Sequence, residues 1–382
     1  MVARIKAIFI WLIHQLAALS GWRLLTRQQT EGVLTPHVIA SQPEGHVPLP
    51  EIRDAGNPDR IVFRAKVAIT PPAWVWHLPA PKQTSTVLPC GAVKTGDTVL
   101  CTDYWNHQAF LDRLRPRTRP VVYVETVVAP FGHHQDPLTF GGYYDFICLV
   151  TTKLCRMEAS LPNGFTDMAI AYPLFGTAYE VELLTYLGFA PDRIFDSRQV
   201  EVRANHYLLG SGGDWFYPSL ADVEAVQKRL SPLIPLTPLL GPTRIYMSRT
   251  GRRRVTNEDA LMRMLTQYGF VYVEDKPGSL GEQLSLYRGA SFIIGPHGAS
   301  FTNINWCTPG THLHELCSVN YAPDFFLYLA QARQLHYSVS LHGEPLRQRF
   351  RQALVEDITV SIPVVERHLN HLLQAQTQLI SP

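Results

Sequence analysis

The sequence of 382 residues has few charged residues and no excess of one sign. Charged residues make up 17% of the chain, against a typical share of about 25%. The 34 lysines and arginines nearly offset the 32 acidic residues, so the net charge is only +2. Nucleic-acid binding needs a concentrated basic surface, so we expect no nucleic-acid partner. The hydrophobic share of 46% excludes a disordered chain.

Cysteine is also scarce, and several sequence motifs are missing. Six cysteines without a Cys-x-x-Cys pair predict free thiols in a reducing compartment rather than a disulfide framework. A P-loop, a G-x-G-x-x-G after a strand and a G-x-S-x-G are absent, so a P-loop NTPase, a nicotinamide enzyme and an α/β-hydrolase are unsupported. No H-E-x-x-H occurs, and we expect no metal site, although isolated candidate ligands exist at His133-His134, His312-x-His314 and Asp145.

The sequence contains no run of 18 uninterrupted apolar residues, so it does not predict a transmembrane helix. The N-terminus is nevertheless apolar, because residues 7–13 and 16–19 follow Arg4 and Lys6. This segment fits a short signal anchor, a packed or disordered terminal helix, or an interfacial helix with Trp11, Trp22 and Arg23 at the boundary. We expect peripheral membrane contact through residues 1–27.

Length and proline content predict two main domains. Four of the 29 prolines fall within residues 230–242, where proline stiffens the chain and blocks regular pairing. We therefore expect an apolar segment at 1–30, an acceptor-side α/β domain at 31–230, a linker at 231–242, a donor domain at 243–345 and a C-terminal helical region at 346–382.

Strand and helix patterns alternate, which predicts an α/β fold. In the C-terminal domain we expect strands at 244–247, 270–274, 291–294, 312–316 and 335–340. Helices are expected at 257–268, after the capping box Ser279-x-x-Glu282, after Gly298 and at 323–332. This is the pattern of a doubly wound parallel sheet, which binds ligands at the carboxyl ends of its strands.

The N-terminal pattern is less regular. It predicts strands at 60–69, 121–128, 168–171 and 206–209, and helices at 143–157 and 179–187. A final helix over residues 364–376 is expected to pack back across both domains.

One loop carries the sharpest chemical signal. Gly295-Pro296-His297-Gly298-Ala299 joins a strand to a helix, so its glycines allow close backbone approach and the helix offers free N–H groups to an anion. Ser248-Arg249 follows the first strand of the same sheet. Since parallel strands end at one edge, we expect Arg249 and His297 to converge there, although a structural histidine is the alternative.

Further polar residues surround the same edge. Arg252, Arg253 and Arg254 precede Asn257-Glu258 at the start of a helix, and Glu315 ends the fourth strand. An arginine cluster suits phosphate, and a strand-end carboxylate suits a ribose. The alternatives are a solvated charged turn and a turn carboxylate. The chain has 27 arginines and seven lysines, which GC-rich coding also explains.

These residues resemble a known family. The motifs Ile245-Tyr-Met-Ser-Arg249, Arg253-Arg254-x-x-Asn257-Glu258, Leu280-x-Glu282-Gln283, Ile293-Ile-Gly-Pro-His-Gly-Ala299, Thr302-Asn303 and Glu315-Leu316 are similar to those of glycosyltransferase family 61. The resemblance covers roughly residues 140–375 and leaves the first 130 unplaced. It implies a GT-B architecture, with two Rossmann-like domains facing each other across a cleft, a nucleoside-diphosphate sugar as donor, inversion and no required metal or cofactor.

The donor site that follows consists of Ser248, Arg249, Arg253, Arg254, Asn257, Glu258, Glu282, Gly295, His297, Gly298, Ala299 and Glu315. His297 and Asp145 are the predicted catalytic residues. The sequence departs from the family's upstream motif at Gly142 and Asp145, where Asn and His are usual. An aspartate with a reference pKa of about 3.9 is a weaker base than histidine unless it is buried. The alternative is a structural role, because an aspartate at a helix N-terminus is favoured by the helix dipole.

The predicted activity is transfer of a sugar to a hydroxyl of a cell-surface polysaccharide or of a lipid-linked or other glycan precursor. We expect a cytoplasmic enzyme, peripheral on the inner face of a bacterial membrane. The alternatives are a catalytically silent nucleotide-sugar-binding or scaffold protein of the same fold, and a phosphate-ester hydrolase.

Overall fold

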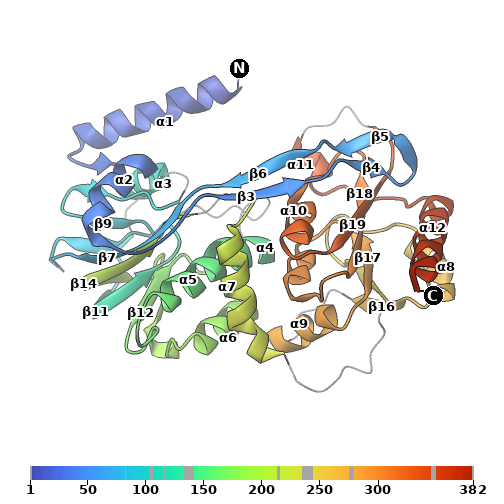
Figure 1. Cartoon of the computed structure of the whole chain (residues 1–382). Helices are drawn as coiled ribbons and strands as arrows, with labels where there is room; N and C mark the ends of the chain where they lie inside the picture. Colours follow the sequence, from blue (N-terminus) through green and yellow to red (C-terminus); the bar gives the residue numbers. More distant parts are fainter. Residues whose placement is uncertain are drawn as a thin grey trace. The chain divides into compact units, whose positions relative to one another are not determined.

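The chain folds into two compact α/β units in the computed structural model (Figure 1). The first comprises Met1–Gly45 and Thr70–Arg229, and the second comprises His46–Ile69 and Leu230–Pro382. The structure describes residues 2–380 except 82, 104–105, 115–116, 133–141, 213–215, 235–243, 275–278 and 346–349. Much of the predicted linker therefore lies outside the described residues.

The assignment of residues 31–230 to one domain was wrong for residues 46–69, which belong to the second unit. Strand β4 (Ile52–Asp54) pairs in parallel with β19 (His336–His342), with Asp54 opposite Val339. Strand β5 (Asn57–Phe63) then pairs with β4. The predicted strand at 60–69 is accordingly divided between β5 and β6 (Lys66–Thr70), which pairs with β3 (Gly45–Leu49).

The first unit contains a six-stranded sheet in the order β13-β12-β11-β14-β7-β2. Strands β11 to β14 are parallel, and β7 runs antiparallel to both of its neighbours, β14 and β2. The predicted strands at 121–128, 168–171 and 206–209 are confirmed. The bounds are β2 Val38–Gln42, β7 Ala73–Pro79, β11 Val121–Ala129, β12 Ala169–Tyr172, β13 Ile194–Asp196 and β14 Glu201–Gly210.

Helices and a smaller sheet complete this unit. The predicted helix at 143–157 consists of α4, a π-helical turn over Phe146–Thr151 and α5, and the helix at 179–187 is α6. The small sheet has the order β1-β10-β9-β8. The bounds are α2 Arg27–Leu34, α3 His107–Arg113, α4 Tyr143–Asp145, α5 Thr152–Ala159, α6 Ala178–Tyr186, α7 Leu220–Leu230, β1 Arg23–Leu24, β8 Ser85–Val87, β9 Val93–Thr95 and β10 Thr98–Val99.

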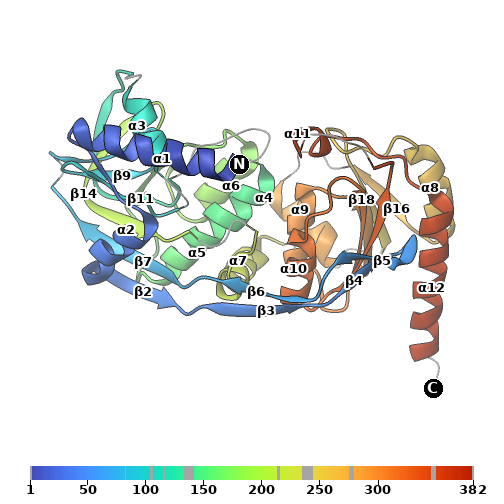
Figure 2. The same cartoon turned by 90° about the horizontal axis from the view of Figure 1, so that it is seen from above.

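The apolar N-terminal segment forms helix α1 (Val2–Leu19). Ile13 and Ala17 are buried in a cluster that includes Val99 and Phe110 of the first unit. Figure 2 shows α1 running along this unit beside α3. Within the described residues, no helix has the length and apolar character needed to cross a membrane.

The second unit is built on a seven-stranded sheet in the order β16-β15-β17-β18-β19-β4-β5. All five predicted strands are present and mutually parallel. The chain passes from β15 outward to β16 and then returns to the other side of β15 with β17. The carboxyl ends of β15 and β17 therefore form a topological switch point, where sheets of this kind bind ligands. The new bounds are β15 Arg244–Ser248, β16 Val271–Glu274, β17 Phe292–Pro296 and β18 His312–Ser318.

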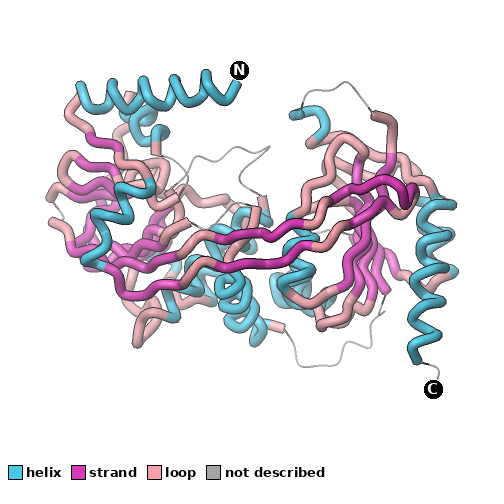
Figure 3. Tube along the Cα trace, turned by 45° about the horizontal axis from the view of Figure 1, so that its top comes forward, coloured by secondary structure: helices cyan, strands magenta, loops and turns pink. Residues whose placement is uncertain are grey.

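Helices flank the strands of the second unit (Figure 3). All four helices expected among its strands are present, and the predicted capping box of Ser279 and Glu282 opens α9. The segment after Gly298 is a 3₁₀ helix, η5, rather than an α-helix. The bounds are α8 Glu258–Gln267, α9 Leu280–Arg288, η5 Ala299–Trp306, α10 Phe325–Ala332, α11 Phe350–Ala353 and α12 Ile362–Ile380.

The predicted C-terminal helix is α12, and its packing across both domains stays a prediction. Val365 and Leu369 of α12 pack with Leu261 and Leu265 of α8 in one core cluster of the second unit. The same unit holds a histidine cluster, which we define as the buried His312, His314 and His342 with the half-buried His368, whose ring lies 4.8 Å from that of His314.

Hydrogen bonds join β18 to β19 through this cluster. Ser338 Oγ lies 2.7 Å from a ring nitrogen of both His312 and His314. Ser340 Oγ lies 3.0 Å from His314 and 2.8 Å from His342. Burial lowers the pKa of His312 to about 3. These rings are therefore neutral hydrogen-bonding groups at neutral pH.

Candidate functional site

The candidate site lies at the switch point of the second unit. Gly295 makes the close approach of β17 and β15 there possible, because a Cβ at Gly295 would lie 2.5 Å from the carbonyl oxygen of Met247. The strands then lead directly to Arg249 and His297. The predicted convergence of these two residues is confirmed, since Arg249 Nη1 donates a hydrogen bond to the His297 carbonyl at 3.1 Å.

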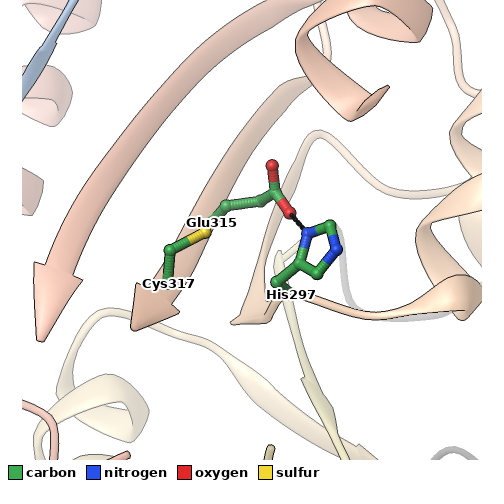
Figure 4. A group of neighbouring side chains, drawn as sticks. All are labelled: His297, Glu315 and Cys317. Carbon is green, nitrogen blue, oxygen red and sulfur yellow. Dashed lines mark hydrogen bonds and ion pairs between the residues drawn. The ribbon is translucent and has the colours of Figure 1, made fainter. Parts of the chain in front are cut away.

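A buried carboxylate supports the His297 ring (Figure 4). His297 Nδ1 lies 2.7 Å from Oε1 of Glu315, whose side chain is fully buried. Tyr337 donates its hydroxyl hydrogen to Oε2 of the same carboxylate at 2.5 Å. An ionised Glu315 accepts at both oxygens, which places the proton of a neutral His297 on Nδ1. The second ring nitrogen, on the side away from Glu315, is then a proton acceptor (Figure 4).

Opposing influences act on the protonation of His297. Burial lowers its pKa most, and the positive charges of Arg253 and Arg249 lower it further, whereas Glu315 raises it. An anion bound beside the two arginines would offset their charge and favour the imidazolium form.

Arg249 lies directly over the glycine that follows His297. A Cβ at Gly298 would fall 1.7 Å from Nη1 of Arg249 and 2.8 Å from its Cζ. The φ angle of Gly298 is −168°, an extended conformation open to any residue. Glycine is therefore needed here because a side chain would clash with Arg249, and not because of an unusual backbone conformation.

Arg253 adds a second positive charge beside His297. Its backbone has φ of 61°, in the left-handed region that non-glycine residues rarely adopt. Its guanidinium carbon lies 5.5 Å from the Tyr321 ring, which packs edge-on against His297 at 5.4 Å. Its Nε is buried and has no hydrogen-bond partner among the described residues. Burial and then the charge of Arg249 lower the pKa of Arg253 to about 10, so it stays charged at neutral pH.

The polar groups around Ser248 bind one another. Ser248 is only 1% exposed and donates to Glu258 Oε1 at 2.7 Å. Tyr246 donates to the same oxygen at 2.8 Å, and Tyr272 donates to Ser248 at 3.1 Å. In this arrangement Ser248 and Glu258 fasten the end of β15 to α8.

Three other predicted donor-binding residues also have partners of their own. Arg254 is exposed and forms an ion pair with Asp357 at 2.8 Å. Asn257 exchanges two hydrogen bonds with the backbone of Val360, at 2.8 and 2.9 Å. Glu282 accepts from the Ser279 backbone N–H in the capping box of α9. The structure does not group these side chains with Arg249, His297 and Glu315.

The remaining predicted positions belong to the loop itself. Ala299 begins η5, and its carbonyl accepts a hydrogen bond from Thr302 at 2.6 Å. Gly295 lies in β17, and Gly298 is the N-cap residue of η5. The first N–H groups of η5 point toward its N-terminal end, as in any helix.

Asp145 lies in the first unit, where its carboxylate caps a helix. Its Oδ2 accepts the Gly142 N–H at 3.0 Å, and the residue is 7% exposed. Tyr144 beside it donates to the Phe216 carbonyl at 2.9 Å. The alternative of a helix-terminal aspartate is thus confirmed as one of its roles, and its catalytic role stays a prediction.

One group of possible metal ligands includes residues of this site. Ligand atoms of His297, Glu315 and Cys317 lie within 4.8 Å of one another. Among the described residues, this is the group of three or more possible metal ligands that lie close together. The His297–Glu315 contact of 2.7 Å is a hydrogen bond, shorter than the spacing of about 3.3 Å between two ligands at zinc distances. His133 and His134 lie outside the described residues. All six cysteines are free, as predicted, and all are buried.

Sequence reasoning missed Tyr321, Tyr337 and Cys317. Strand alternation was an available signal for Cys317, because Glu315 and Cys317 are two residues apart on β18 and share one face. His312 and His314 alternate with them and face the histidine cluster instead. Tyr337 lies on the neighbouring strand opposite Leu313, so its reach to Glu315 depends on register. Tyr321 follows the strand in a turn and had no comparable signal.

Comparisons with known proteins agree on one class. The family model described as Glycosyltransferase 61 matches residues 98–314. The range begins upstream of the expected 140–375 and ends one residue before Glu315. The chain is also 33% identical over 73 residues to the xylan glycosyltransferase MUCI21 of Arabidopsis thaliana. That alignment covers 18% of this chain and 15% of the relative's length.

Proposed function

This chain belongs to the glycosyltransferase 61 family, and on that premise we propose that it transfers a sugar from a nucleoside-diphosphate sugar, with inversion. The acceptor is a hydroxyl of a cell-surface polysaccharide or of a lipid-linked or other glycan precursor. The relative's description as a xylan glycosyltransferase supports a polysaccharide acceptor. Two Rossmann-like domains in a GT-B arrangement are part of the proposal, supported by a parallel core of strands in the sheet of each unit.

The switch point with Arg249 and His297 is the observation that carries this proposal. Transfer breaks the bond between the anomeric carbon and the diphosphate oxygen, so negative charge develops on the leaving diphosphate. Arg249 and Arg253 would neutralise that charge, and no metal is then required. Their charge–charge repulsion in a partly buried site is relieved when the diphosphate binds.

His297 would act on the same leaving group. The protonated ring donates from the nitrogen opposite Glu315 to a diphosphate oxygen. Glu315, itself held by Tyr337, fixes the ring orientation and stabilises the imidazolium. Inversion also needs a base that takes the proton of the acceptor hydroxyl, and Asp145 is the proposed residue.

A catalytically silent nucleotide-sugar-binding protein is the second candidate. It is favoured by the capping bond from Gly142 to Asp145, which occupies the carboxylate of the proposed base. Both candidates share the donor site and differ only in turnover.

The test combines donor binding with product release. The protein is titrated with UDP- and GDP-sugars and then incubated with glycan acceptors, while free nucleoside diphosphate is measured. Arg249→Ala and His297→Ala are expected to lower donor affinity or turnover by at least about tenfold, because each loses a charge-assisted contact of about 1.5–3 kcal/mol. Arg263→Ala, an exposed arginine on α8, is the matched control and should behave as wild type. Binding without turnover on every acceptor would favour the silent protein, and unchanged kinetics in both site variants would refute the site.

A further inference from the structure

The outer face of α1 is an apolar surface on the first unit. Its large side chains are 45% to 86% exposed, and we define them as the outer face of α1: Ile8, Phe9, Trp11, Leu12, Leu16 and Leu19. At 100° per residue, these six fall within one arc of about 160°. Monomeric soluble proteins seldom expose so large an uninterrupted apolar stripe without a partner for it.

The opposite face of α1 is already occupied. Ile13 is 3% exposed and Ala17 is fully buried, and both pack in the core cluster with Leu24 and Phe110. Arg113 of α3 also holds the end of the helix by donating to Ser20 Oγ at 3.0 Å. The helix is therefore fixed along the first unit and presents one side outward. A partner must meet it from the side and cannot surround it.

Basic residues border the end of this face, where Arg27 is already paired with Glu31 at 3.0 Å. Residues 1–30 include Arg4, Lys6, Arg23 and Arg27 and contain no Asp or Glu. Arg23 is exposed directly after the helix. Arg113 lies 4.5 Å from the centre of the Trp22 ring, with its exposed guanidinium beside the same helix end. Basic side chains that border an apolar face match the anionic headgroups and acyl chains of a lipid surface.

A groove beside α1 is lined by one of these basic residues, Arg23. Trp11 and His14 of the helix line it on one side, and Arg23 and Gln29 line it on the other. An aromatic ring and a guanidinium thus line one groove, and this combination is favoured where headgroups meet acyl chains.

We infer that α1 docks this protein on an anionic bilayer, lying in the plane of the membrane with its outer face inserted among the acyl chains. Arg23 and Arg113 contact headgroup phosphates. This role is separate from the donor site, because every residue that carries it belongs to the first unit.

The test is flotation with vesicles of phosphatidylcholine alone and of phosphatidylcholine mixed with phosphatidylglycerol. The wild-type chain should bind the anionic vesicles, and added salt should weaken this binding. The Leu12→Glu/Leu16→Glu variant should lose binding at least about tenfold, because two charges replace inserted side chains. Arg23→Gln should weaken binding to the anionic vesicles about fivefold.

A control variant with the same chemical change lies elsewhere. Val181→Glu/Val67→Glu replaces two exposed apolar residues, on α6 and β6, and should bind vesicles as wild type does. Nucleoside-diphosphate binding should be equal in all variants, which shows that each is folded. Wild-type protein that ignores anionic vesicles, or equal binding by Leu12→Glu/Leu16→Glu, would overturn the inference. So would a dimer in solution that this double variant makes monomeric.

Discussion

Replacing Gly298 with alanine should displace the Arg249 guanidinium from the donor site while leaving the arginine in the chain. The added Cβ would lie 1.7 Å from Nη1, whereas non-bonded heavy atoms prefer about 3.5–4.0 Å, so the guanidinium must move by roughly 2 Å. That movement breaks its hydrogen bond to the His297 carbonyl and takes it away from the diphosphate. Loss of one charge-assisted contact, about 1.5–3 kcal/mol, corresponds to about 10- to 150-fold weaker donor binding.

The assay is isothermal titration with whichever of UDP or GDP binds the wild-type chain. A double-mutant cycle with Arg249→Ala gives the decisive comparison, because Gly298→Ala has nothing to displace once the arginine is gone. The two substitutions should therefore be strongly non-additive. Thermal stability should change little, since φ at Gly298 suits alanine. Gly251→Ala, with no atom within 4 Å of the new Cβ, is the control. Additive effects, or unchanged affinity in Gly298→Ala, would refute the reasoning.

Three further predictions concern buried polar groups. Glu315→Gln removes the carboxylate that raises the pKa of His297, so the limb of the kcat/KM–pH profile that reports His297 should move to lower pH; an unmoved limb contradicts this role. The histidine cluster has lowered pKa values in the folded state, with His342 at about 4. Its contribution to stability is full above about pH 6.5 and is lost as the pH falls toward 4, because the unfolded chain then binds protons that the folded chain does not. Urea unfolding should therefore give a lower free energy of unfolding at pH 5 than at pH 7, and equal values would contradict this prediction. Lys153→Met leaves Asp103, its partner at 2.6 Å and 3% exposed, buried without its ion-pair partner, although Oδ2 still accepts the Gly132 N–H. It should cost about 3–5 kcal/mol of unfolding free energy, and Asp103→Leu added to it should restore part of that loss.

The sheet of the second unit was predictable because its signals are local. Runs of β-branched and aromatic residues predicted its five strands, and the Ser279 capping box predicted the start of α9. Parallel strands end at one edge, which was enough to bring Arg249 and His297 together. The partner of β4 was not predictable, because the pairing of Asp54 with Val339 joins segments that are far apart in sequence. Periodicity identifies a strand and does not identify its neighbour.

The candidate site was predictable only in part, since residue type does not reveal which polar groups bind each other. Ser248 and Glu258 suit a donor site as single residues, and the structure shows them bonded together. Arg254 was equivalent to Arg253 in the sequence, yet it pairs with Asp357 on an exposed loop. The left-handed backbone at Arg253 separates the two, and nothing local in the sequence required it.

The most direct test of the account is the NMR signal of the His297 ring in protein labelled with ¹⁵N-histidine, assigned with His297→Gln. Saturating nucleoside diphosphate should shift this signal toward the imidazolium form, because the bound anion offsets the charges of Arg249 and Arg253. The histidine cluster, on the opposite face of β18, is the internal control and should not move. A His297 signal that stays unchanged while nucleotide binds would contradict the claim that the switch point of the second unit is the donor site.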